Sequence, residues 1–93
     1  MKQVTIGNHI WDALYFKKGY YFIITKEELK TLGYDQPKHT FSVDNKTHTY
    51  DCEVVYESHR VEHILKHMIE FNIQRFDTYT DELISIRLYE KSA

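Results

Sequence analysis

The stretch from Ser58 to Phe71, SHRVEHILKHMIEF, constrains the fold most, because it is the clearest helix in the chain. Apolar residues recur in it at the spacing of one helical face. The hydroxyl of Ser58 can accept hydrogen bonds from the free amides of the first turn. The apolar stripe consists of Val61, Ile64, Leu65, Met68 and Ile69. Because such a stripe needs a surface to cover, we expect residues 58–71 to be the main helix, packed on a sheet.

An alternating pattern in residues 41–56 predicts that sheet. Apolar and polar residues alternate along the segment, which is typical of an antiparallel sheet with one buried and one solvated face. If Asn45 and Lys46 form a two-residue turn, Phe41 lies opposite Tyr50. The predicted inward face carries Phe41, Val43, His48, Tyr50, Cys52, Val54 and Tyr56.

Strand-like segments occupy much of the remaining chain. Residues 2–6, 20–24 and 83–89 are rich in β-branched or aromatic side chains. Residues 73–79 are mixed, with Phe76 and Tyr79 as candidate anchors, and residues 80–82 resemble a turn. These segments supply the other strands of the predicted sheet.

A short helix is predicted at about residues 26–32. Thr25 and Glu28 have the spacing of a capping box, and Gly33 is a suitable residue to end the helix. Residues 9–16, in contrast, fit two structures. They can form a helix, or the first arm of a hairpin in which Gly19 takes the left-handed position of a three-residue turn. The aromatic residues on both sides favour the hairpin.

Together these elements predict one α+β domain over residues 1–93. It has five or six mostly antiparallel strands, with the helix at about 58–71 packed on one face and a short helix at about 26–32. The 93 residues leave room for a single core, and the single cysteine, Cys52, excludes a disulfide framework. No segment has the signal-peptide pattern or approaches the ~20 apolar residues of a membrane span, so we expect a cytoplasmic protein without membrane contact.

The aromatic residues between positions 11 and 22 are the strongest candidates for a binding surface. The chain holds eight tyrosines and five phenylalanines, and neighbouring residues of a strand cannot all be buried on one face. We expect the surplus to contact a protein partner or a second copy of the chain, as a homodimer. The predicted contact residues are Trp11, Tyr15, Phe16, Lys17, Lys18, Tyr20 and Tyr21.

Histidines suggest two alternative sites. His59, His63 and His67 follow one another at i, i+4 steps, a spacing that can place two imidazoles on one divalent metal. However, no cysteine or acidic cluster is placed to complete such a site, so we predict a solvated helix face without metal or cofactor. His39 and His48 lie on the two arms of one predicted hairpin. Both are near hydroxyl groups and lysines, as acid–base catalysis would require.

The leading hypothesis is a small non-enzymatic protein-binding module, an inhibitor or regulator of a larger protein. In size and pattern the chain is similar to many small bacterial and phage-encoded proteins that bind another macromolecule. One alternative is a metal- or histidine-dependent nuclease or hydrolase. A second alternative is a weak binder of single-stranded nucleic acid, which the formal net charge of −2 disfavours.

Overall fold

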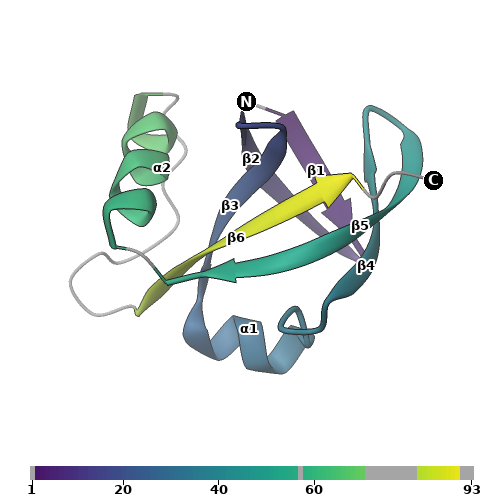
Figure 1. The fold of residues 1–93 in the computed structure, drawn as a ribbon, viewed down its shortest axis with the longest axis horizontal. Helices are drawn as coiled ribbons and strands as arrows, with labels where there is room; N and C mark the ends of the chain where they lie inside the picture. Colours follow the sequence, from purple (N-terminus) through teal and green to yellow (C-terminus); the bar gives the residue numbers. More distant parts are fainter. Residues whose placement is uncertain (1, 57, 71–81, 91–93) are drawn as a thin grey trace.

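The computed structural model describes residues 2–56, 58–70 and 82–90, which form six strands and two helices (Figure 1). The elements are, in chain order, β1 (Lys2–Ile6), β2 (His9–Phe16), β3 (Gly19–Thr25), α1 (Lys26–Leu32), β4 (Lys38–Val43), β5 (Lys46–Val55), α2 (Ser58–Glu70) and β6 (Leu83–Glu90). The predicted segments 73–79 and 80–81 lie outside the described residues, and so does Ala93.

The six strands close into an antiparallel barrel in the order β1-β2-β3-β6-β5-β4. Closure is made by the pairing of β1 with β4, in which Val4 lies opposite Val43 and Ile6 opposite Phe41. The predicted α+β fold, an open sheet with the main helix on one face, is therefore wrong. The sheet covers its own apolar face by curling until its edges pair, which also removes both free edges.

The interior of the barrel is the main hydrophobic core. Trp11 stacks on Phe22 with 5.0 Å between ring centroids, and Tyr34 meets both rings edge-on. Alternate residues of all six strands supply the rest: Val4, Ile6, Ala13, Ile24, Phe41, Val43, Tyr50, Ile84, Ile86 and Leu88. Of the inward face predicted within residues 41–56, Phe41, Val43 and Tyr50 lie in this core, and Cys52 and Val54 pack against it. Tyr56 is 68% exposed, so the prediction is wrong there. The surface that covers this face is the opposite wall of the barrel rather than a helix.

The short helix α1 closes one end of the barrel (Figure 1), and its predicted signals are confirmed. Thr25 Oγ1 accepts from the amide of Glu28, and the Glu28 carboxylate accepts from the Thr25 amide, which completes the capping box. Gly33 ends the helix in the left-handed conformation, with φ of 71°. Leu29 of this helix is buried against the interior core.

The helix α2 lies on the outside of the barrel and forms a second, smaller core (Figure 1). Ile64 is its one fully buried residue among those described, and it packs over Tyr21, Ile23 and Val55. Val61 and Leu65 of the predicted stripe are half-buried at the margin of this core. The helix itself is confirmed, but it covers one outer face of a barrel that is already closed.

Residues 9–16 form a strand, so the hairpin interpretation is confirmed, but the predicted turn is wrong. The turn contains two residues, Lys17 and Lys18, both with positive φ (50° and 61°), and Phe16 pairs with Gly19. Gly19 lies in the strand, at a position where a Cβ would be 2.8 Å from Nε of Arg87. Close packing, not backbone conformation, explains this glycine.

The second predicted turn is shifted by one position. Asp44 and Asn45 form it, with φ of 53° and 66°, and Phe41 therefore pairs with His48 instead of Tyr50. Both central residues of such a turn need positive φ, which Asp and Asn tolerate better than Lys. The register changes by two residues, so the predicted faces of the two strands are retained.

Replacing Lys18 with glycine is expected to stabilise the protein by about 0.5–1 kcal/mol, because lysine is strained at φ of 61° and glycine is not. The corresponding rise in melting temperature is about 2–8 °C in a domain of this size. Lys46→Gly is the matched control, because Lys46 lies in extended strand and its replacement should destabilise. A lower melting temperature for Lys18→Gly would contradict the turn geometry.

Candidate functional site

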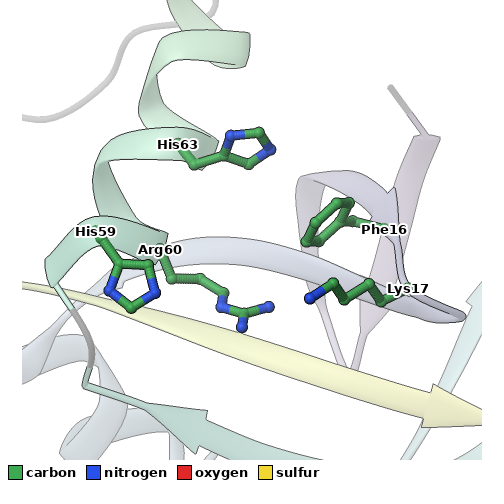
Figure 2. A pocket seen from close by; sticks show the side chains of 5 residues that line it. All are labelled: Phe16, Lys17, His59, Arg60 and His63. Atoms are coloured by element: carbon green, nitrogen blue, oxygen red, sulfur yellow. The ribbon is translucent and has the colours of Figure 1, made fainter.

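A pocket of about 260 Å³ opens on the outer face of the barrel, between the β2–β3 turn and α2 (Figure 2). It is lined by Phe16, Lys17, His59, Arg60 and His63. Each of these residues is basic, imidazole-bearing or aromatic, and no carboxylate of the described residues lines the pocket. The pocket therefore has the lining expected of an anion site with one apolar wall.

Two elements far apart in the sequence supply this lining. Phe16 is the last residue of β2, and strand alternation places its ring on the outer face, 6.0 Å from the ring of Tyr21 and 5.3 Å from that of His63. Lys17 follows in the turn. From α2, His59 and His63 are one helical turn apart and Arg60 lies between them, so all three reach the same side.

Arg60 is held in place by the outer face of the barrel. Its guanidinium donates a hydrogen bond of 2.9 Å to the hydroxyl of Tyr21, a residue with no exposed surface. The guanidinium carbon also lies 5.2 Å from the Tyr21 ring and 5.9 Å from the Phe16 ring, within cation–π range. These contacts preorganise the charge of Arg60 at the pocket.

Lys17 brings a second cation to the same place. Its Nζ lies 5.4 Å from the centroid of the Phe16 ring, and Figure 2 shows the ammonium and the Arg60 guanidinium pointing toward each other. The ion pairs found among the described residues include Lys2–Asp44, Lys26–Glu82 and His48–Glu90, and neither Lys17 nor Arg60 takes part in them. Two like charges thus converge without a described acidic side chain between them.

Arg87 holds the backbone of the β2–β3 turn in place. Its guanidinium donates a 2.7 Å hydrogen bond to the carbonyl oxygen of Lys17 and stacks 3.9 Å from the ring of Tyr89. Tyr89 in turn donates to the carboxylate of Glu53 at 2.6 Å. Burial, followed by this hydrogen bond, raises the pKa of Tyr89 to about 12. Arg87 therefore fixes the backbone that carries Lys17 and adds positive charge near the pocket.

The predicted aromatic surface is divided by strand alternation. Trp11 is buried inside the barrel and Tyr21 is buried under α2, so neither ring is available to a partner. Tyr20 is half-buried at the barrel rim beside Tyr50, and Tyr15 is 58% exposed next to it. Phe16 and Lys17 line the pocket, and Lys18 is exposed on the turn.

The three helix histidines also separate. His59 and His63 line the pocket, whereas the Nδ1–H of His67 donates to the carbonyl oxygen of His63 at 3.0 Å. The rings of His63 and His67 lie 4.7 Å apart. Within the described ranges, no group of three histidine, cysteine or acidic side chains is placed to hold a metal ion.

The two hairpin histidines contact different partners. His39 pairs with Tyr50 and packs on the ring of Tyr34, whereas His48 pairs with Phe41 and lies 3.8 Å from the Glu90 carboxylate. Cys52 donates to the carbonyl oxygen of Tyr34 at 3.4 Å, and burial raises the pKa of its thiol to about 12. A thiol that stays protonated is a poor nucleophile, which agrees with a structural role for Cys52.

His39 predicts a pH dependence of stability. Burial lowers the pKa of His39 below the ordinary value of 6.5. The unfolded chain therefore binds a proton at this residue more readily than the folded protein does. The free energy of unfolding should therefore fall as the pH decreases through 6.5. Urea unfolding between pH 7.5 and 5 measures this slope. His39→Gln should reduce it, and identical slopes in both proteins would contradict the assignment.

Comparison of the chain with models of protein families, with curated proteins and with solved structures finds no match. Its class is therefore defined by the fold and the pocket alone: a small antiparallel barrel with a basic, aromatic-lined pocket on its outer face. Neither α1 nor α2 has the length and apolar content needed to cross a membrane. The barrel overturns the predicted α+β class, and no observation supports a role as an inhibitor or regulator.

Proposed function

We propose that this protein is a non-enzymatic binding module that contacts a protein partner through the turn–helix surface. This surface consists of Phe16, Lys17, Lys18, His59, Arg60 and His63. The observation that carries the proposal is the convergence of Lys17 and Arg60 on a pocket without a described carboxylate. A partner that places an acidic group there would offset the repulsion between the two cations.

The composition of the surface supports protein recognition. Arginine and aromatic residues are enriched where protein partners bind, because they combine a large contact area with directional polar groups. Arg60 is already fixed by Tyr21, so its side chain loses little freedom on binding. The formal net charge of −2 disfavours the uniformly charged backbone of a nucleic acid.

The expected homodimer does not fit this surface. Self-association through it would bring the cations of one copy toward those of the other, at a cost in free energy. We therefore propose a different protein as the partner. The proposed setting remains the cytoplasm, which is supported by Cys52 being the only cysteine in the sequence and so having no disulfide partner in the chain.

Affinity capture from the native cell lysate tests the proposal. Lys17→Glu/Lys18→Glu should lower the recovery of specifically retained protein at least tenfold relative to the parent chain. Lys38→Glu/Lys46→Glu is the matched control, with the same charge change on two exposed lysines of β4 and β5. Undiminished recovery with the Lys17/Lys18 variant, after circular dichroism shows that it is folded, would refute the proposed contact surface.

A second candidate is histidine-dependent hydrolysis of a phosphate ester. One observation favours it: His59 and His63 line the same pocket as Arg60 and Lys17, so acid–base groups and cations meet there. Turnover of bis(p-nitrophenyl) phosphate that is lost in His63→Gln would favour this candidate. Absence of turnover at high protein concentration would exclude the hydrolase and leave the binding module as the proposed function.

A further inference from the structure

We infer that the pocket binds the phosphate of a phosphorylated side chain on the protein partner. This inference names the group recognised at the turn–helix surface and therefore rests on the proposed function. It depends on three properties of the pocket, which are its charge, its shape and its size.

The charge arises from groups that the fold holds together. Arg60 is anchored on the Tyr21 hydroxyl, and the backbone of Lys17 is anchored by Arg87. Their cationic ends converge in Figure 2, one from the helix and one from the turn. The Arg60 guanidinium is held by its hydrogen bond to Tyr21, whereas Lys17 is held at its backbone and its ammonium lies over the Phe16 ring. An anion between them converts that repulsion into two attractive contacts.

The arrangement of donors favours phosphate over carboxylate. A phosphomonoester carries a charge of about −1.5 to −2 at neutral pH and has three acceptor oxygens, whereas a carboxylate has one charge and two oxygens in a plane. Arg60 and Lys17 approach the pocket from different elements, and His59 and His63 border it along α2. Donors on several sides of one space suit a tetrahedral anion.

The size of the pocket limits the ligand to a single small group. Its volume of about 260 Å³ lies below the roughly 300–1,000 Å³ of ordinary small-molecule sites. A phosphate with the end of the side chain that carries it is compatible with this space, and the Phe16 ring supplies an apolar wall for the carbon atoms. A whole nucleotide would extend well beyond the lining residues.

Titration of the full chain with phenyl phosphate tests the pocket directly. Amide signals of residues 16–18 and 59–63 in two-dimensional NMR spectra should shift and saturate, at constant ionic strength. Benzoate, which has the same ring with a carboxylate, should bind at least tenfold more weakly. Equal affinities for the two probes, or shifts spread evenly over all lysine-bearing surfaces, would overturn the inference.

Two variants locate the binding. Lys17→Gln and Arg60→Gln should each weaken phenyl phosphate binding at least tenfold, and Lys46→Gln, the control, should leave it unchanged. Lys17→Gln is the decisive variant, because the Lys17 ammonium lies over the ring of Phe16 in its own hairpin and its loss should not disturb α2. Unchanged affinity in this variant would refute the site.

Phosphatase treatment of the native lysate, with the phosphatase removed before capture, separates this inference from the proposed function. Loss of the captured protein supports a phosphorylated partner. Retained capture would overturn the inference while leaving the proposed function standing. If phenyl phosphate binds but no protein is captured with or without phosphatase, the proposed function fails, and the phosphorylated partner fails with it.

Discussion

Replacing Phe22 with alanine is expected to lower the free energy of unfolding by about 3–5 kcal/mol. The Phe22 side chain has no exposed surface, and its ring stacks on Trp11 and meets Tyr34 edge-on. Each strand of a closed barrel is hydrogen-bonded on both sides, so the wall cannot easily collapse into the cavity that the substitution leaves. A chain of 93 residues has a total stability of roughly 5–14 kcal/mol. The variant should therefore retain only a small free energy of unfolding, or be unfolded.

Urea unfolding followed by circular dichroism measures this loss. Tyr15→Ala is the matched control, because Tyr15 is also an aromatic residue of the β2–β3 hairpin but is 58% exposed. Its replacement should change the stability by less than about 1 kcal/mol. Similar losses in the two variants would mean that the barrel interior is not the main core.

The local elements of this fold are readable from the sequence, whereas barrel closure is not. The capping box at Thr25 and Glu28 is a contact between near neighbours, and it forms as predicted. The pairing of Val4 with Val43, in contrast, depends on the curvature of the whole sheet. A strand with one apolar face has the same alternating sequence whether a helix or the opposite barrel wall covers that face. The helix stripe at 58–71 therefore suggested a larger role for α2 than the structure gives it.

The contrast between local elements and barrel closure also applies to the prediction of the site. A single open sheet has fewer buried positions than a closed barrel, so the prediction overestimated how many rings must reach the surface. Trp11 is inside the barrel, and Tyr21 is covered by α2. Phe16 and Lys17 were predicted as contact residues and lie in the pocket, whereas Arg60 and Arg87 were missed. Helical spacing connects Arg60 with its neighbours in α2, but no sequence signal connects it with Lys17.

Replacing Ile64 with alanine is expected to release α2 from the barrel without opening the barrel. Removal of a fully buried isoleucine side chain costs about 2–5 kcal/mol, and Ile64 is the one described helix residue that is fully buried in the outer core. Val61 and Leu65 contribute less because they are half-buried. A helix of 13 residues is marginal in water by itself, so α2 should melt once it loses this contact.

Hydrogen exchange distinguishes local release from global unfolding. Amides of residues 60–67 should lose protection in Ile64→Ala, whereas those of Phe22 and Ile86 should keep it, because the interior core does not include the helix. Lys66→Ala, an exposed position on the same helix, is the control and should leave both groups protected. Phenyl phosphate binding should disappear with the helix, since three of the five pocket residues belong to α2. If Ile64→Ala instead unfolds the barrel in the same transition, the two cores are one cooperative unit, and the helix is as essential to the fold as its apolar stripe suggests.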